Sequence, residues 1–211
     1  MSRGAGAGAE EGAMTRVDTD RIERAVHELL LAIGEDPERP GLERTPRRVA
    51  EAYAEYFSGI GVDATLPLAD AVPAGETDAG AAATSDAVVL RELSFRSVCE
   101  HHLVPFTGTA HIAYLPGERI VGLGRIPAVL DTVSSRPQLQ ERIAEEVADA
   151  LEAGLQPRGV LVVLDAVHTC VTTRGARQAR SSTVTVASRG EFAAPAARAE
   201  VMALIGSGSG G

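Results

Sequence analysis

The sequence predicts an α+β domain, because stretches with the periodicity of helices are interspersed with stretches typical of strands. Apolar side chains recur between Ile22 and Ile33 at the spacing i, i+3, i+4, i+7, i+8 and i+11, which indicates one face of an amphipathic helix. The same helical spacing recurs in 137–154, whereas 159–168 is a nearly continuous apolar run typical of a buried strand. The chain of 211 residues is long enough for one such domain with a core and some extensions.

Two helices are expected near the N-terminus. The first begins after a cap at Asp18 or Asp20 and closes near Gly34. The second begins at Thr45-Pro46, where threonine suits the N-cap and proline suits the first helical position. Further along the chain we expect strands over 87–97, 107–115, 159–168 and 181–188, and helices over 137–154 and 195–205.

The composition of each stretch suggests how the chain is divided. Two terminal stretches rich in glycine with alanine or serine read as flexible tails, and one internal stretch without periodicity reads as a flexible linker. We therefore predict a disordered tail over 1–17, N-terminal helices over 18–60, a linker over 61–86, a catalytic domain over 87–206 and a second tail over 207–211.

Composition also excludes several classes of function. All 20 basic residues are arginine, so Schiff-base chemistry, pyridoxal-phosphate attachment and a P-loop lysine are excluded. The net charge of −9 disfavours a nucleic-acid partner, although clustered arginines could still bind a small polyanion. The chain has no apolar run long enough to span a membrane and its start lacks the apolar region of a secretory signal, so we expect a cytoplasmic protein without a membrane partner.

Cysteine and histidine residues gather in two short windows of the sequence. Cys99 and His102 lie three positions apart, and Cys170 is expected at the end of a buried strand across the fold. Two thiolates and one imidazole make the ligand set of a catalytic zinc ion, which leaves a fourth position open for a water that the metal converts to a hydroxide nucleophile. Two alternatives stay open: a closed structural zinc with His101 or His168 as fourth ligand, and a buried free thiol beside unrelated histidines.

His101 and His168 are adjacent to the candidate ligands and remain available for chemistry. An imidazole titrates near neutrality, so this pair could both give and take protons. His168 could instead be a core histidine on a strand. Its spacing of two from Cys170 would place both side chains on one strand face, which favours the functional interpretation.

Polar residues suited to a nucleotide occur at two further places. Gln140 and Glu141 lie early in the helix over 137–154, where an amide and a carboxylate can read a donor edge such as the N1–H and 2-amino group of guanine; the alternative is a solvated helix face. Four arginines could contact phosphates or be ordinary surface charges, namely Arg125, Arg174, Arg177 and Arg180.

These motifs together resemble the GTP cyclohydrolase I family. The likeness runs from about residue 20 to 205 and is carried by four segments: LLLAIGEDPERPGLERTPRRVAEAY (29–53), SVCEHHLVPFTGTAHIAYLPG (97–117), RPQLQERI (136–143) and DAVHTCVTTRGAR (165–177). The combination of CEHHLVPF with the downstream HTC and RG is highly specific.

The resemblance implies a fold, an assembly and a reaction. The fold would be the tunnelling fold, with a four-stranded antiparallel sheet backed by helices, and the assembly a decamer of two pentameric rings with active sites between subunits. The reaction would begin with zinc-bound water adding to C8 of GTP, followed by ring opening, release of formate, rearrangement of the ribose and closure to 7,8-dihydroneopterin triphosphate, the first step of folate and pterin biosynthesis.

The resemblance also implies roles for individual residues. Cys99, His102 and Cys170 would be the zinc ligands, and His101 and His168 the proton-transfer residues. Glu141 would read guanine with Gln140 beside it. Arg48 and Arg174 match positions that contact phosphate in the family.

The chain departs from the family pattern where the triphosphate would bind. The family usually has serine, lysine and arginine where this chain has Gly124, Arg125 and Ala128, and Glu51 stands at an often basic position. Each lost charge-assisted contact would weaken phosphate binding by about 1.5–3 kcal/mol. We therefore expect a divergent paralogue that holds the phosphates differently. Two alternatives remain: a same-fold enzyme that acts on another purine nucleotide or stops at the formamide intermediate, and a non-catalytic zinc-stabilised oligomer that binds nucleotides.

Overall fold

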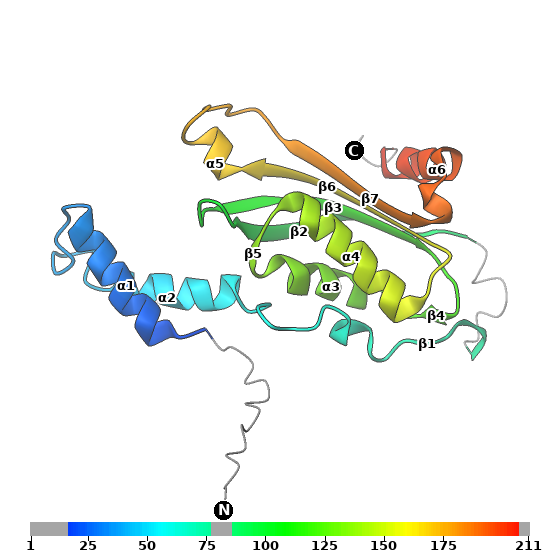
Figure 1. The fold of residues 1–211 in the computed structure, drawn as a ribbon, viewed down its shortest axis with the longest axis horizontal. Coiled ribbons are helices and arrows are strands. Elements are labelled where there is room, and N and C mark those ends of the chain that lie inside the picture. The colour runs from blue at the N-terminus through cyan, green and yellow to red at the C-terminus, as the bar shows by residue number, and fades with distance from the viewer. Residues whose placement is uncertain (1–16, 77–85, 207–211) are drawn as a thin grey trace, which may run out of the picture.

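The computed structural model describes residues 17–76 and 86–206, and it confirms the α+β class (Figure 1). A twisted sheet forms the centre, and helices cover its faces. The helices are α1 (Thr19–Ala32), α2 (Thr45–Tyr56), α3 (Arg125–Ser134), α4 (Gln140–Leu155), α5 (Thr169–Thr172) and α6 (Pro195–Gly206), with short 3₁₀ turns η1 (Leu66–Leu68), η2 (Ala74–Glu76) and η4 (Glu191–Ala193). The strands are β1 (Val72–Pro73), β2 (Val88–Cys99), β3 (Pro105–Leu115), β4 (Arg119–Ile120), β5 (Pro137–Gln138), β6 (Gly159–His168) and β7 (Thr183–Gly190).

The main sheet has the strand order β5-β2-β3-β6-β7. Four of its strands, β2, β3, β6 and β7, are antiparallel neighbours, as the family resemblance implied. The expectation of four strands was nevertheless incomplete, because the sheet has a fifth strand, the two-residue β5, which runs parallel to β2. Such a short strand, which contains a proline that cannot donate a ladder hydrogen bond, has no periodic signal in the sequence. β5 places the start of α4 beside Cys99, since Cys99 pairs with Gln138.

The alternation of side chains along β3 explains why both faces of the sheet are covered. Successive side chains of a strand point to opposite faces. Ala110 and Ile112 belong to the larger core, with α3 and α4, whereas Ala113 and Leu115 belong to a second core with α6. β3 is therefore apolar on both sides.

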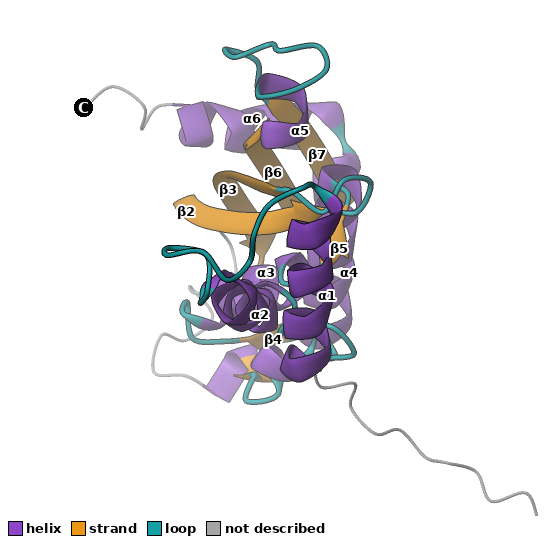
Figure 2. Ribbon diagram, turned by 90° about the vertical axis from the view of Figure 1, so that its left-hand side faces the viewer, coloured by secondary structure: helices purple, strands orange, loops and turns teal. Residues whose placement is uncertain are grey.

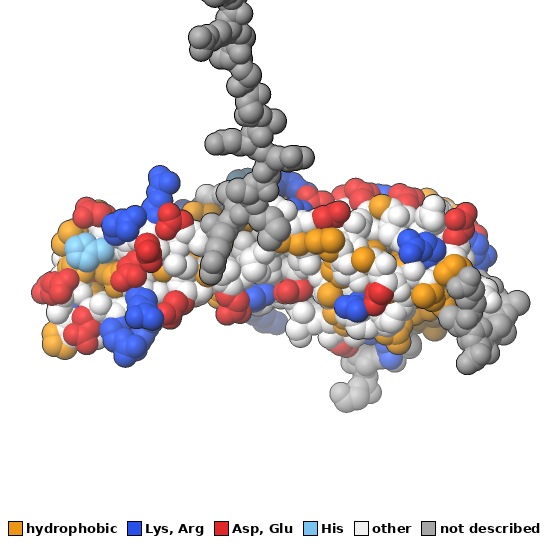
Figure 3. Space-filling model, turned by 90° about the horizontal axis from the view of Figure 1, so that it is seen from below, with side chains coloured by type: hydrophobic (Ala, Val, Ile, Leu, Met, Phe, Trp, Pro, Cys, Tyr) orange, Lys and Arg blue, Asp and Glu red, His pale blue; other side chains and the backbone are white. Residues whose placement is uncertain are grey.

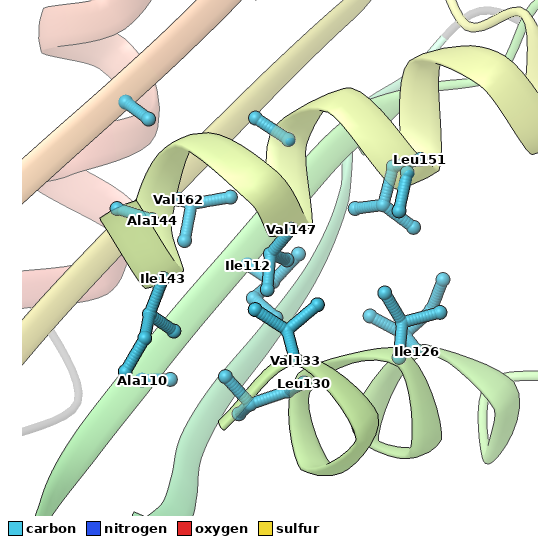
Figure 4. Close-up of a cluster of buried hydrophobic side chains, with 14 of the residues drawn as sticks. Ala110, Ile112, Ile126, Leu130, Val133, Ile143, Ala144, Val147, Leu151 and Val162 are labelled. Atoms are coloured by element: carbon cyan, nitrogen blue, oxygen red, sulfur yellow. The ribbon is translucent and has the colours of Figure 1, made fainter. Parts of the chain in front are cut away.

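The larger core lies between α3, α4 and the sheet. Figure 4 shows Ile143 and Val147 of α4 facing Leu130 and Val133 of α3. Each of these side chains is at most 2% exposed. Burying one such aliphatic side chain stabilises the fold by about 1.5–3 kcal/mol, so this layer fixes α4 and with it the residues at its N-terminus.

The first part of the expected linker is packed against this core. Leu68, in η1, is 1% exposed. It lies on Gly154 of α4, where an added Cβ would come within 2.5 Å of the Leu68 side chain. The prediction of a flexible linker over 61–86 is therefore wrong for residues 61–76, because Leu68 and the pairing of β1 with β4 anchor them. Residues 77–85 lie outside the described part, as do nearly all of the tail predicted over 1–17 and the tail over 207–211.

The two N-terminal helices form a pair that projects from one end of the sheet (Figures 1 and 2). The predicted cap is present, because the Asp18 carboxylate accepts a hydrogen bond of 2.9 Å from the backbone N–H of Arg21. α1 packs on α2, yet Leu29 and Ile33 of its apolar stripe are 58% and 69% exposed. Within the described residues, no helix combines the length and apolar character needed to cross a bilayer.

Candidate metal centre and active site

A tight turn between β2 and β3 brings the first two candidate ligands together. The backbone N–H groups of His102 and Leu103 both donate to the carbonyl of Cys99, at 3.3 and 2.8 Å. Leu103 closes the turn in the left-handed region, with φ of 51°. As a result Cys99 Sγ lies 3.8 Å from His102 Nδ1.

Cys170 reaches the same place from the neighbouring strand. β6 ends at His168, which pairs with Phe106 of β3, and Cys170 lies in the single helical turn α5 that follows. The expectation that Cys170 ends the strand and shares a strand face with His168 is therefore wrong, because the backbone turns at Thr169. The turn is held by the Thr169 hydroxyl, which donates to the carbonyl of Pro105.

The three candidate ligands form one cluster that fits a zinc ion. One ligand atom from each of Cys99, His102 and Cys170 lies within 4.8 Å of the others. A tetrahedral zinc ion with thiolate and imidazole ligands needs separations of roughly 3.5–3.8 Å, so small adjustments of the side chains suffice. Cys99 is buried, Cys170 is half-buried and His102 is exposed, which leaves one side of the cluster open.

The electrostatics of the thiols also fit a cation. Burial raises the pKa of the Cys170 thiol, and the neighbouring Cys99 raises it further, whereas the positive charge of Arg174 lowers it. The Cys170 thiol, whose ionisation is opposed in this way, is stabilised as a thiolate by a bound dication.

His168 is held at the edge of the cluster by two neighbours. Its ring stacks on Phe106 with centroids 4.4 Å apart and 16° between the planes. Its Nε2 lies 2.7 Å from Oε1 of Gln140. Burial lowers the pKa of His168, and the charge of Glu141 opposes that shift. The neutral imidazole is therefore favoured. The sequence analysis gave Phe106 no role, although Phe106 ends the CEHHLVPF motif that begins at Cys99.

The two polar residues at the start of α4 have different environments. Glu141 is exposed, as a residue that reads a ligand must be. Gln140 is 1% exposed and its amide already bonds to the protein. Its side chain is therefore turned away from solvent, contrary to the expectation that it lies beside Glu141 as a second reading group.

A bidentate ion pair ties α4 to the ligand turn. Arg142 donates to both carboxylate oxygens of Glu100, at 2.6 and 3.2 Å. The Arg142 guanidinium lowers the pKa of the Glu100 carboxyl. Sequence reasoning missed this pair, although Glu100 stands inside the CEHH motif. His101, the neighbour of Glu100, is exposed, and its ring centroid lies 6.2 Å from that of His102.

The candidate phosphate residues are spread over the molecule. Arg174 follows α5 and is close enough to influence the Cys170 thiol. Arg125 begins α3 and binds Asp70, at 2.6 Å. The other end of α3 lies closer to the ligand turn, because the Ser97 hydroxyl of β2 donates to the carbonyl of Ser134. The ten residues of α3 span roughly 15 Å at about 1.5 Å per residue, so Arg125 stands apart from the metal cluster within one chain.

The remaining candidates lie in exposed segments. Arg48 is exposed on α2, where charged side chains of both signs are interspersed (Figure 3). Glu51, at the position that is often basic in the resembled family, accepts a hydrogen bond of 2.9 Å from Arg47. Arg177 and Arg180 are exposed in the segment between α5 and β7.

Comparison with known proteins gives a consistent result. The family model described as GTP cyclohydrolase I matches residues 22–206. A protein of Leifsonia xyli subsp. xyli named GTP cyclohydrolase 1 is 61% identical over 93% of this chain and 100% of its own length. Proteins of the same name from Rhodopirellula baltica and Clostridioides difficile are each 49% identical, over 90% and 91% of this chain and 80% and 98% of their own lengths.

Proposed function

The chain belongs to the GTP cyclohydrolase I family, and from that premise we propose that it hydrolyses GTP to 7,8-dihydroneopterin triphosphate and releases C8 as formate. The observation that carries this proposal is the meeting of Cys99, His102 and Cys170 beside His168. A non-catalytic zinc-stabilised oligomer would have no use for a histidine held so firmly at the edge of the cluster.

Zn²⁺ is the metal that the three-residue cluster suits. Cys99, His102 and Cys170 would hold it and leave a fourth position open on the exposed side. When bound there, zinc supplies Lewis-acid chemistry that makes water nucleophilic near neutral pH. The cysteines must stay reduced for this purpose, which favours the cytoplasm as the location.

The residues around the cluster divide the remaining work. His168 and His101 move protons to and from the opening ring, because an imidazole can do both at neutral pH. Glu141 binds the N1–H and 2-amino group of guanine, since an exposed carboxylate at the start of α4 offers two acceptors to two adjacent donors.

The distribution of the arginines favours active sites that are shared between subunits. Within one chain, Arg125 is separated from the ligand turn by the length of α3, since Ser134, at the other end of that helix, is the residue that contacts Ser97 of β2. A second copy could instead place its own Arg125 beside the first copy's cluster. The exposed edge strand β7, with Val184 and Val186 58% and 45% exposed, offers a surface for such assembly. We propose that the protein is a homo-oligomer. Its membership of the family favours a decamer of two pentamers whose subunits have the tunnelling fold.

The grip on the triphosphate is the part of the function that differs from the family pattern. Gly124 and Ala128 supply no polar side chain, and Glu51 is an acid that pairs with Arg47. Arg48, Arg125 and Arg174 remain as candidate cations, and Asp70 shares Arg125. We propose that GTP is the substrate. We also propose that its phosphates are bound less strongly than in family members that keep a polar or basic side chain at positions 51, 124 and 128. Kinetics with GTP, GDP, GMP and guanosine tests this, and an ordinary strong preference for GTP contradicts it.

The reaction itself is tested by following the C8 carbon. GTP labelled with ¹³C at C8 is incubated with zinc-loaded protein, and products are separated by mass spectrometry. Labelled formate with an unlabelled pterin triphosphate supports the proposal. A labelled formamide product instead shows that the reaction stops after ring opening, and unchanged GTP contradicts any such hydrolysis.

A further inference from the structure

Gln140 is a buried amide with an unusual set of partners. It opens α4, and its side chain enters the layer between α4 and the sheet, where it is 1% exposed. Its amide nitrogen lies 3.1 Å from the carbonyl oxygen of Leu164, 2.7 Å from that of Thr183 and 3.2 Å from the hydroxyl oxygen of Thr185. The amide thus bridges β6 and β7 from the end of the helix.

These partners decide which way the amide faces. Backbone carbonyl oxygens only accept hydrogen bonds, so the atom that faces Leu164 and Thr183 must be the NH₂ nitrogen. The opposite orientation would set the amide oxygen against two carbonyl oxygens inside the protein, where an unpaired buried acceptor is costly. The oxygen Oε1 is therefore the atom directed at His168, at 2.7 Å from its Nε2.

The orientation of Gln140 determines the protonation pattern of His168. An amide oxygen cannot donate, so a hydrogen bond at this distance requires that His168 Nε2 carries the hydrogen. The neutral ring then has its lone pair on Nδ1, which accepts no hydrogen bond from the residues that the structure describes. Stacking on Phe106 prevents the ring from turning over freely.

We propose that Gln140 is a positioning residue that fixes His168 as the Nε2–H tautomer, with Nδ1 as the acceptor atom of the ring. The proposal stands on the contacts of the Gln140 amide, whose nitrogen is held by Leu164 and Thr183 and whose oxygen faces His168 Nε2. This inference rests on the proposed function, because an oriented acceptor beside the cluster serves the hydrolysis of GTP.

The inference assigns Gln140 a role other than contact with the nucleotide. A residue that reads the base contributes to ground-state binding, and its removal raises KM. A residue that only orients a proton carrier acts on the chemical step, and its removal lowers kcat with KM nearly unchanged.

The test uses Gln140→Met in the zinc-loaded oligomer, with Gln138→Met as matched control. Gln138 is also a buried glutamine, 1% exposed; its amide nitrogen donates to the carbonyl of Val133 and to Glu146, its amide oxygen accepts from Arg142 at 3.4 Å, and it has no contact with His168 among the described residues. Both variants lose one buried amide of similar size. Gln140→Met is expected to lower kcat about 10–100-fold with zinc content and KM unchanged, at a temperature where the variant is folded. Gln138→Met serves as the control for the loss of a buried amide and is expected to leave the tautomer of His168 as in the parent.

A spectroscopic measurement keeps the inference independent of activity. Magic-angle-spinning NMR of ¹⁵N-histidine protein at about pH 8, with His168→Ala to assign the signal, reports which ring nitrogen carries the hydrogen. The parent is expected to show Nε2–H for His168, and Gln140→Met a mixture of tautomers. An Nδ1–H signal in the parent, or a parent-like Nε2–H signal in Gln140→Met, overturns the inference. So does a rise in KM without a fall in kcat. Failure of the parent to turn over GTP would instead refute the proposed function, while the tautomer result would still stand.

Discussion

The guanidinium of Arg142 grips the carboxylate of Glu100 with two hydrogen bonds, of 2.6 and 3.2 Å, and so joins helix α4 to the turn that carries Cys99 and His102. Glu100 follows Cys99 in the chain, and Arg142 follows Glu141. The pair therefore links the segment that carries the candidate metal ligands to the segment that carries the proposed reader of the base.

Arg142→Met should loosen that link without removing any ligand. We expect zinc to remain bound and kcat/KM for GTP to fall about 3–30-fold, because small misplacements of reacting groups are costly. Arg189→Met is the matched control, since Arg189 also pairs with carboxylates of α4, Glu145 and Asp149, but far from the turn. An equal loss in both variants would show that only the general stability of α4 matters.

The same pair predicts a pH dependence of stability. Arg142 lowers the pKa of Glu100 from its ordinary value of 4.5. The contribution of the pair is therefore fully present above that value and is lost as the pH falls through the lowered folded-state pKa. The difference in melting temperature between the parent and Arg142→Met should be largest near neutral pH and should shrink in acid. A difference that grows in acid would contradict this assignment.

Cys170→Ala should remove the metal. The cluster would keep one thiolate and one imidazole, which do not make a stable zinc site. We expect zinc, measured by mass spectrometry of the metal after dialysis, to fall from about one ion per chain to a small fraction, and turnover to disappear. Val171→Ala, in the same helical turn, should retain both. A Cys170→Ala protein with full zinc would exclude Cys170 as a ligand.

His168→Ala should separate chemistry from metal binding. The residue lies beside the cluster but is not among its three ligands, so zinc should stay. Loss of a proton-transfer group should lower kcat by about 10²–10⁴-fold. Retention of full activity would remove His168 from the mechanism.

Glu141→Gln should impair recognition of the base. An amide offers one acceptor and one donor group where two adjacent donors need two acceptors. We expect kcat/KM for GTP to fall at least tenfold, and discrimination against the inosine analogue, which lacks the 2-amino group, to weaken. Glu152→Gln, exposed on the same helix, is the control and should behave as the parent. Unchanged discrimination in Glu141→Gln would place base reading elsewhere.

Sites shared between subunits predict complementation between two defective chains. Arg125→Ala and His168→Ala should each be nearly inactive alone. Mixed oligomers assembled from equal amounts should regain about one quarter of the parent's sites, since each intact site then takes its cluster from one chain and its arginine from another. Mixtures with no more activity than the separate variants would refute the sharing of Arg125.

Much of the fold could be predicted because its signals are local. The helical spacing from Ile22 to Ile33, together with the expected cap at Asp18 or Asp20 and the closure near Gly34, gave α1 to within two residues at each end, and the apolar run over 159–168 coincides with β6. The packed part of 61–76 could not be predicted, because it is anchored by a single leucine, Leu68, whose partner glycine lies 86 positions further along the chain.

The candidate site shows the same division. Cys99 and His102 were found from their spacing, because one turn brings them together. The contact between Gln140 and His168 joins residues 28 positions apart and depends on how α4 meets the sheet. The helix α3 was not among the expected helices, although the sequence carries a signal for it. Its buried apolar residues have helical spacing, namely Ile126, Val129, Leu130 and Val133.

The most direct test of the proposed function is the stoichiometry of GTP turnover by the purified protein as its zinc is removed and restored. The account predicts one formate and one fluorescent pterin, measured after oxidation, for each GTP consumed, with both signals lost on chelation and recovered with about one zinc ion per chain. Turnover that is unaffected by complete removal of the metal, or a fully zinc-loaded protein that leaves C8 of GTP in place, would contradict it.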